Sequence, residues 1–264
     1  MRRQVMAEAK TAVANKPAWV DLSTSDAPAA REFYSKLFGW KVEVNPDPQY
    51  GGYGMANVGG KQVAGIGPQM SPEAPTAWSV YIGTDDADDL AKKVQTAGGK
   101  VIAPPFDVGD QGRMAVFQDP TGAFISAWQP RAMNAGLPSG EPGTFAWAEL
   151  SSRGVDKAIS FYQKVFGWTP KTSDVGPDSP PYTEFQLGGE SIAGGQEMNK
   201  MVPAQVPSYW LVYFAVSDVD KSFKTATQAG AREMVSPMDF PGGRFAILSD
   251  PQGAAFGLLK MAPR

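Results

Sequence analysis

Histidine and cysteine are both absent from the 264 residues of this sequence. Histidine is the commonest general acid or base and the commonest metal ligand in proteins, so catalytic dyads and triads that depend on imidazole are excluded. Without cysteine there are no disulfides, thiol nucleophiles or thiolate metal ligands. Any chemistry must therefore use Asp, Glu, Tyr, Lys or Arg side chains, or a bound cofactor.

Excess positive charge and long hydrophobic runs are also lacking. The 24 basic and 27 acidic residues leave a net charge of −3, which argues against a nucleic-acid partner. No apolar run is long enough to span a membrane, and residues 1–13 lack the apolar stretch that a signal peptide needs. We therefore expect a cytoplasmic protein without nucleic-acid or membrane partners, in which residues 1–16 form a loose N-terminal arm.

A long internal repeat is the main positive feature of the sequence. The motif FYSKLFGW at residues 33–40 recurs as FYQKVFGW at residues 161–168. The motifs GRMAV and DPTGA, at residues 112–116 and 119–123, recur as GRFAI and DPQGA, at residues 243–247 and 250–254. Such repetition indicates a tandem duplication. We predict one module at residues 17–130, a Pro- and Gly-rich linker at 131–143, and a second module at 144–264.

Hydrophobic periodicity and turn residues predict the same order of elements in both copies. In the first copy, strands are expected at residues 18–24, 42–44, 53–58, 62–66, 78–83, 101–103, 113–118 and 124–128. Helices are expected at residues 26–39 and 86–97. In the second copy, strands are expected at residues 146–151, 184–187, 191–194, 210–216, 244–248 and 255–260, with helices at 155–166 and 219–229. The glycine pairs at 59–60, 188–189 and 194–195 are predicted to lie in turns between strands.

This order, with its Phe-Tyr-x-x-x-Phe-Gly-Trp and Gly-Arg-x-Ala…Asp-Pro-x-Gly-Ala motifs, resembles the vicinal oxygen chelate superfamily. That superfamily includes glyoxalase I, bleomycin-resistance proteins and extradiol dioxygenases, and the resemblance covers residues 17–262. The whole chain also resembles tandem-module glyoxalase-like proteins of actinobacteria. The resemblance implies an α+β fold of two modules, each with paired βαβββ units that form a curled mixed sheet around a cleft. Because duplication replaces the dimer of single-module relatives, a monomer and a homodimer are both compatible with it.

The resemblance also places the metal-ligand positions of the family, which lie on the first, fifth and last strands of a module. In module one these positions hold Trp19, Ser79 and Ser126. In module two they hold Trp147, Leu211 and Gly257. Zinc, iron and nickel prefer imidazole and carboxylate ligands. We therefore predict no metal site and no cofactor, which puts glyoxalase I and dioxygenase chemistry in doubt.

Alternate side chains of a strand share one face, so neighbours of the ligand positions are predicted to line the same clefts. The first cleft is predicted to contain Trp19, Asp21, Ser79, Tyr81, Ser126 and Trp128. The second cleft is predicted to contain Trp147, Glu149, Leu211, Tyr213, Gly257 and Leu259. Residues 20, 22, 80, 82, 125 and 127 would then pack against the helices. Paired Trp and Tyr side chains with one acid fit a mostly apolar ligand pocket.

The cleft residues allow a functional and a structural interpretation. Trp19 and Trp147 either contact a ligand or fill a cleft that has lost its metal. Asp21 and Glu149 are candidate general bases if burial raises their pKa, and are otherwise acceptors for neighbouring amide or arginine groups.

The repeated motifs outside the clefts are interpreted as structural. The aromatic residues of the first motif recur at helical spacing, which is typical of core packing. Arg113 and Arg244 follow glycine at matched positions, and they pair either with the cleft acids or with Asp107 and Asp239.

Two functions remain open from the sequence. The first is a binding protein that holds a small aromatic or conjugated molecule in a metal-free cleft. The alternative is an enzyme of the same superfamily, a lyase, hydroxylase, hydrolase or cyclase, that uses Asp21 or Glu149 as its acid or base.

Overall fold

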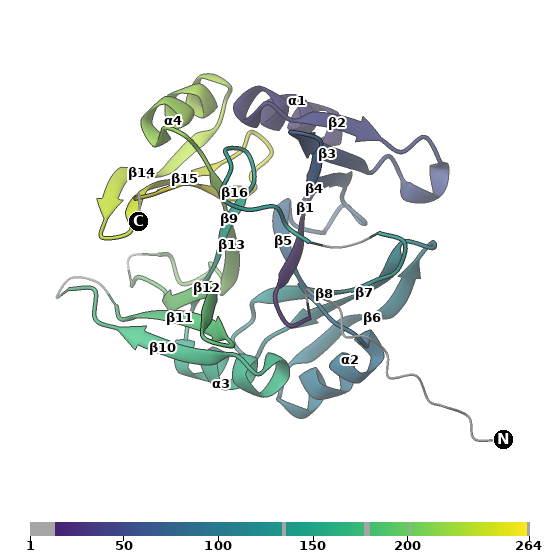
Figure 1. Cartoon of the computed structure of the whole chain (residues 1–264), viewed down its shortest axis with the longest axis vertical. Helices are drawn as coiled ribbons and strands as arrows, with labels where there is room; N and C mark the ends of the chain where they lie inside the picture. The colour runs from purple at the N-terminus through teal and green to yellow at the C-terminus, as the bar shows by residue number, and fades with distance from the viewer. Residues whose placement is uncertain (1–13, 134–135, 177–179, 201, 263–264) are drawn as a thin grey trace.

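The computed structural model describes residues 14–133, 136–176, 180–200 and 202–262. Their strands form two eight-stranded mixed sheets, one for each copy of the repeat (Figure 1). The first sheet has the order β2-β3-β4-β1-β5-β8-β7-β6 and comprises β1 (Pro17–Thr24), β2 (Lys41–Val44), β3 (Gly54–Val58), β4 (Lys61–Pro68), β5 (Ala77–Gly83), β6 (Lys100–Val108), β7 (Gly112–Gln118) and β8 (Phe124–Pro130). The second has the order β10-β11-β12-β9-β13-β16-β15-β14 and comprises β9 (Phe145–Ser152), β10 (Thr169–Ser173), β11 (Tyr182–Leu187), β12 (Glu190–Glu197), β13 (Tyr209–Ala215), β14 (Arg232–Phe240), β15 (Gly243–Ser249) and β16 (Ala255–Met261). The matching orders confirm the predicted α+β fold of two tandem modules.

The helices of the described residues are α1 (Ala27–Phe38), α2 (Ala87–Thr96), α3 (Val155–Phe166), α4 (Val219–Gln228) and a short 3-10 turn, η1 (Pro48–Tyr50). Asp26 caps α1 because its side chain accepts a hydrogen bond from the Ala29 backbone nitrogen. Gly39 ends the helix with a φ of 72°, in the left-handed region that glycine adopts without steric cost. Among these helices, none is long and apolar enough to cross a membrane.

The central strands of each sheet bring the predicted cleft residues together. β1 runs parallel to β4 and antiparallel to β5, and β5 runs parallel to β8. Trp19 therefore lies opposite Tyr81, and Tyr81 lies beside Ser126 on the next strand. The strands β9, β12, β13 and β16 repeat this pattern in module two.

The helices lie where the two modules meet. α1 packs beside α4, and α2 packs beside α3 (Figure 1). The Tyr34 hydroxyl, from the first aromatic motif, donates a 3.0 Å hydrogen bond to Asp250 Oδ2 in module two. The Tyr162 hydroxyl donates a 2.8 Å hydrogen bond to Asp119 Oδ2 in module one. The repeated motifs thus bond each module to the other.

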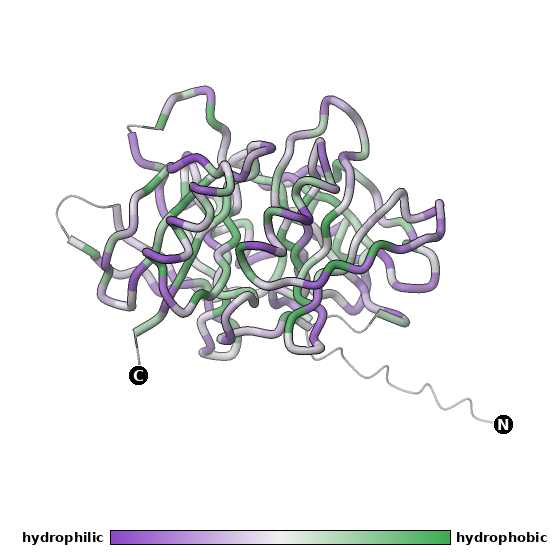
Figure 2. The backbone as a smooth tube through the Cα atoms, turned by 90° about the horizontal axis from the view of Figure 1, so that it is seen from above, coloured by the Kyte–Doolittle hydropathy of each residue, from purple (hydrophilic) through white to green (hydrophobic). Residues whose placement is uncertain are grey.

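A single buried core extends through both modules. Figure 2 shows the two lobes side by side, with hydrophobic stretches of chain inside each. Phe38 contacts Phe214 across the junction at a ring-centroid distance of 5.0 Å, and Phe33 contacts Phe256 at 6.0 Å. The structural interpretation of the aromatic motif is therefore confirmed.

Several local predictions are wrong, and most errors lie at sheet edges. β10 and β14 were not expected, and β6 is longer than the predicted strand at 101–103. These three strands occupy sheet edges and contain Pro170, Pro237 and the pair Pro104–Pro105. Proline is tolerated at an edge because the backbone groups on that side need no partner strand, so its presence misled the strand assignment.

Two further expectations are corrected by the structure. Gly194 and Gly195 lie inside β12 instead of in a turn. The end of the arm predicted at 1–16 is bonded to the fold. The Asn15 backbone nitrogen donates to the Gly83 carbonyl, and the Asn15 carbonyl accepts a 2.7 Å hydrogen bond from the Trp168 indole. Residues 1–13 lie outside the described residues.

Candidate functional site

The two faces of each sheet carry different sets of buried side chains. The alternate residues of β1, β5 and β8, at positions 20, 22, 80, 82, 125 and 127, belong to the common core. On the other face is the first-cleft cluster, formed by Ala18, Trp19, Tyr81 and Trp128. The second-cleft cluster is formed by Leu211, Tyr213 and Leu259, with Trp147 packed against it. The structure thus gathers the predicted cleft residues on one face of each sheet, while their role in ligand binding stays a prediction.

A hydrogen-bonded set of four side chains crosses the first cleft. The Trp19 indole nitrogen donates to the Tyr53 hydroxyl at 3.1 Å. The Tyr81 hydroxyl donates to Asp21 Oδ2 at 2.9 Å, and the Tyr53 hydroxyl bonds to the same carboxyl. Ser79 lies opposite Asp21 in the sheet. Asp21 is therefore held by two phenols in a mostly apolar cleft.

The second cleft repeats this arrangement around Glu149. The Trp147 indole nitrogen donates to the Tyr182 hydroxyl at 2.8 Å. Glu149 Oε1 accepts hydrogen bonds from the Tyr213 hydroxyl and from the Gln196 side chain, each at 3.3 Å. The Tyr182 hydroxyl also bonds to the Glu149 carboxyl, so this acid is held by two phenols and an amide.

Tyr53 and Tyr182 were missed by the sequence analysis. Each ring crosses a glycine on the neighbouring strand: a β-carbon on Gly65 would lie 1.7 Å from the Tyr53 hydroxyl oxygen, and one on Gly194 would lie 1.9 Å from that of Tyr182. Gly65 is paired with Asp21, and Gly194 with Glu149. Glycines paired with the two acids were therefore the sequence signal that could have revealed Tyr53 and Tyr182. Gly194 was instead assigned to a turn, and Gly65 was not considered.

Burial sets the proton affinity of both cleft acids. It raises the pKa of Asp21 to about 7, against the opposing effect of the hydrogen bonds from Tyr81 and Tyr53. Burial likewise raises the pKa of Glu149 above its ordinary value. Because desolvation and the nearby Asp21 carboxylate raise the pKa of Tyr81 and Tyr53 well above 10, both phenols remain proton donors. Each cleft can therefore accept or deliver a proton at its carboxyl group.

The matched arginines do not bond to the cleft acids. Arg113 pairs with Asp88 and Asp107, each at 2.9 Å. Arg244 pairs in the same way with Asp220 and Asp239, at 2.8 and 2.9 Å. Both arginines therefore join the start of a helix to an edge strand, as the structural alternative predicted.

The first cleft is covered by other parts of the chain. Met133 and Leu137, from the predicted linker, pack against the first-cleft cluster. Across the sheet, a β-carbon on Gly109 would lie 2.8 Å from the Tyr50 hydroxyl oxygen, so the loop after β2 reaches the turn between β6 and β7. Trp128 is 7% exposed, and Leu259 at the matched position of the second cleft is 8% exposed.

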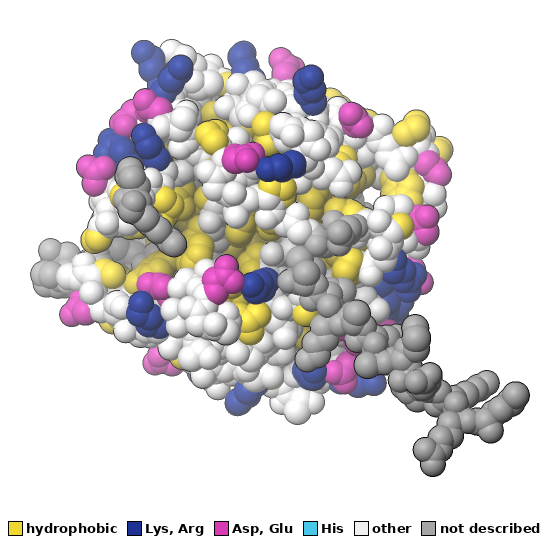
Figure 3. All heavy atoms as spheres, in the orientation of Figure 1, with side chains coloured by type: hydrophobic (Ala, Val, Ile, Leu, Met, Phe, Trp, Pro, Cys, Tyr) yellow, Lys and Arg dark blue, Asp and Glu magenta, His cyan; other side chains and the backbone are white. Residues whose placement is uncertain are grey.

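The second cleft contains a cavity of about 220 Å³. Its lining includes Glu149, Ser151, Gln196, Tyr209, Leu211 and Ile247. Figure 3 shows a hollow on this side of the molecule in which hydrophobic side chains gather, between the halves of module two. Glu197 and Asn199 also line the cavity, so it joins apolar side chains to two carboxyl and two amide groups. Convergent polar groups beside apolar surface are typical of small-molecule sites.

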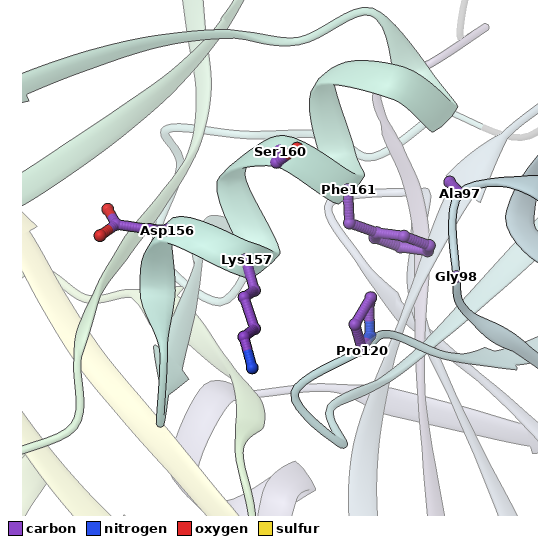
Figure 4. A pocket seen from close by; sticks show the side chains of 7 residues that line it. All are labelled: Ala97, Gly98, Pro120, Asp156, Lys157, Ser160 and Phe161. Atoms are coloured by element: carbon purple, nitrogen blue, oxygen red, sulfur yellow. The ribbon is translucent and has the colours of Figure 1, made fainter.

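A larger hollow, of about 390 Å³, lies at the junction of the modules between α2 and α3. Its lining includes Gly98, Pro120 and Phe161. Figure 4 shows the charged ends of Asp156 and Lys157 pointing away from each other and from the Phe161 ring. Because its polar groups do not converge, we do not assign this hollow as the functional site.

The family's metal positions carry side chains that do not fit a divalent metal. The only oxygen donors at the positions in module one are the hydroxyls of Ser79 and Ser126. In module two, a β-carbon on Gly257 would lie 2.0 Å from the Tyr213 ring, so no ligand side chain fits there. The described residues contain no group of three or more acids that could hold a metal ion.

We therefore expect the purified protein to bind far less than one zinc, nickel, iron or manganese ion per chain. The physical reason is that neither cleft offers imidazole or thiolate, and the described residues contain no group of three or more acids, so strong ligands are too few. Elemental analysis after dialysis measures this directly. About one metal ion per chain that resists mild chelation would contradict the prediction.

Comparisons with known proteins agree with this fold and its duplication. The model of the glyoxalase/bleomycin resistance protein/dioxygenase superfamily matches residues 16–126 and 144–258. A Mycobacterium tuberculosis protein provisionally named glyoxylase CFP32 is 42% identical over 254 residues, which cover 94% of this chain and 95% of that protein. The anthracycline biosynthesis protein DnrV of Streptomyces peucetius is 39% identical over 259 residues, which cover 93% of each chain.

Solved structures share the fold at low sequence identity. The Mn(II)-bound glyoxalase from Novosphingobium aromaticivorans superposes with a TM-score of 0.64 at 16% identity, covering 95% of this chain and 82% of that one. The 2,2',3-trihydroxybiphenyl 1,2-dioxygenase from Sphingomonas wittichii strain RW1 gives 0.63 at 13% identity, covering 92% and 89%. These two likenesses concern the fold alone. Two family-model matches on two sheets of the same topology mean that this chain belongs to the glyoxalase/bleomycin resistance protein/dioxygenase superfamily.

Proposed function

We propose that this chain binds a small aromatic or conjugated molecule in its second cleft, without the help of a metal ion. The observation that carries the proposal is the cavity of about 220 Å³ beside Glu149. In module one, Met133 and Leu137 of the linker pack against the first-cleft cluster. The two clefts therefore differ in what lies against them, and we assign the ligand to the second.

The second cleft offers a ligand both apolar contacts and hydrogen bonds. Leu211 and Ile247 contribute apolar surface to the cavity, and Tyr209 adds an aromatic ring. Glu149 and Gln196 provide an acceptor and a donor whose mutual hydrogen bond is 3.3 Å long. A ligand hydroxyl or carbonyl can replace this weak contact with a shorter one, because the two groups already face the cavity.

The size of the cavity limits the ligand that it encloses. Sites that bury drug-sized molecules usually have volumes of about 300–1,000 Å³, and this cavity has about 220 Å³. One or two rings therefore fit inside, and a larger ring system would project from the cleft. The name of the Streptomyces peucetius relative, an anthracycline biosynthesis protein, supports a ligand with fused aromatic rings.

Titration with 2-naphthol tests the proposal. The wild-type chain is expected to bind one equivalent, and Glu149→Gln is expected to weaken binding by about tenfold, since a hydrogen bond to a charged group contributes about 1.5–3 kcal/mol. The matched variant Asp21→Asn should leave the affinity within about twofold of wild type. Isothermal titration calorimetry measures all three proteins.

Two results would contradict the proposal. One is the absence of measurable binding by the wild-type chain, for 2-naphthol and for larger hydroxylated aromatics. The other is a loss of affinity in Asp21→Asn with none in Glu149→Gln, which would move the site to the first cleft.

A second candidate function is proton transfer to a bound molecule by Glu149. The observation that favours it is a buried carboxyl of raised pKa that lines the cavity, since a general base works best when its pKa approaches the working pH. Incubation with an aryl ketone such as 1-tetralone in D₂O separates the two functions. Deuterium uptake next to the carbonyl that is fast with wild type and lost in Glu149→Gln would favour the enzyme, whereas binding without exchange favours the binding protein.

A further inference from the structure

An aromatic wall extends the second cleft beyond its cavity. The rings of Tyr213 and Phe245 meet edge to face, with centroids 6.3 Å apart and planes at 72°. The rings of Phe245 and Phe240 meet in the same way, at 5.9 Å and 74°. These three residues come from β13, β15 and β14, so the wall crosses one half of the sheet from its centre to its edge.

The wall is continuous with the cavity because both lie on one face of the sheet. Ile247 lines the cavity and stands two residues from Phe245 on β15, so both side chains point to the same side. Phe245 is paired with Met238 on β14 and also contacts the second-cleft cluster. At the outer end, Phe240 is 38% exposed and Met238 is 48% exposed. Apolar surface therefore runs from the Glu149 cavity to the open rim.

The matching surface of module one provides a comparison for this wall. Val108, Met114 and Trp128 occupy the positions that match Phe240, Phe245 and Leu259, as the strand pairings of the two modules show. There, Met133 of the linker packs against the first-cleft cluster, to which Trp128 belongs. Among the described residues, the hydrophobic side chains packed against the second-cleft cluster all come from the strands of module two. None of them is a linker residue equivalent to Met133.

From this difference we infer that the ligand of the second cleft is an elongated aromatic molecule. Its polar end lies at Glu149 and Gln196, and its distal ring lies against Phe245 and Phe240. This inference rests on the proposed function, because it extends the same site. In addition, Phe245 and Phe240 select for ligand length, because a ligand ring that reaches them is buried against their aromatic surfaces and removed from water.

A series of phenols of increasing length tests this inference by calorimetry. In the wild-type chain, 4-phenylphenol should bind at least about tenfold more tightly than phenol, with 2-naphthol between them, because added rings bury more apolar area. In Phe245→Ala the ratio between 4-phenylphenol and phenol should fall to within about threefold, while the affinity for phenol itself stays unchanged. The matched variant Met114→Ala in module one should keep the wild-type ratio.

The remaining outcomes separate the wall from the proposed site. If Phe245→Ala keeps the full preference for the longer phenol while Glu149→Gln weakens binding of the whole series, the inferred role of the aromatic wall is contradicted. The proposed binding site at the Glu149 cavity is then still supported. If no phenol binds to wild type, the proposed function itself fails. Should Phe245→Ala unfold, as its melting temperature would reveal, Phe240→Ala at the exposed rim replaces it, and a length preference unchanged in that variant overturns the inference.

Discussion

Replacing Asp250 by alanine is expected to lower the free energy of unfolding by about 3–5 kcal/mol. Asp250 is fully buried, and its Oδ1 accepts hydrogen bonds from the backbone nitrogens of Gln252, Gly253 and Ala254. Its Oδ2 accepts from Tyr34 across the module junction. Alanine leaves these donors without their acceptor, and each buried donor without a partner costs about 1–3 kcal/mol.

Urea denaturation and the melting temperature measure this effect. At about 2–4 °C per kcal/mol for a chain of this size, the melting temperature should fall by roughly 6–20 °C. Tyr34→Phe serves as the matched variant, because it removes only the bond across the junction and keeps the turn. Its expected cost is about 1–3 kcal/mol. A change below about 1 kcal/mol in Asp250→Ala would mean that the repeated Asp-Pro turn does not hold the modules together.

The second large effect is a pH-dependent gain in stability on replacing Asp21 by asparagine. Burial raises the pKa of Asp21 from 3.8 to about 7, so the folded state holds this proton more tightly than the unfolded state does. Its contribution to stability is therefore full below about pH 4 and is lost as the pH rises toward 7 and above. At about 1.4 kcal/mol for each unit of pKa, the difference amounts to at most about 4 kcal/mol.

Asparagine cannot ionise, so Asp21→Asn should be more stable than wild type at about pH 8, and this advantage should shrink at about pH 4.5. We expect the difference in unfolding free energy between the two proteins to change by about 2–4 kcal/mol across this interval. Taking the difference cancels the contributions of Glu149 and Asp250, whose raised pKa values act in the same direction. A difference that stays constant with pH would show that Asp21 ionises normally in the folded protein.

The repeat explains why so much of the fold could be predicted from the sequence. Two copies of the aromatic motif and of the Asp-Pro turn indicated two equivalent modules, and alternation along β1, β5 and β8 indicated which side chains share a face. The edge strands other than β2 were predicted less well. β10 and β14 are exposed and contain proline, so neither hydrophobic alternation nor strand preference marked them, and β6 was predicted only over residues 101–103.

The candidate site could be predicted only in part. Asp21 and Glu149 were found because acids are unusual in otherwise apolar strands. Tyr53 and Tyr182 were missed because each reaches its acid across a glycine of a neighbouring strand, a contact that depends on sheet order. The packing of the linker residue Met133 against the first-cleft cluster was also beyond the sequence, because it depends on the folded path of the linker.

A crystal structure of the chain grown with 2-naphthol tests the central claim most directly, because it shows which cleft holds the ligand. The account predicts one naphthol in the second cleft, with its oxygen within hydrogen-bond distance of Glu149 or Gln196 and its outer ring directed toward Phe245. Density for naphthol only in the first cleft beside Trp128, or only in the hollow between α2 and α3, would contradict it.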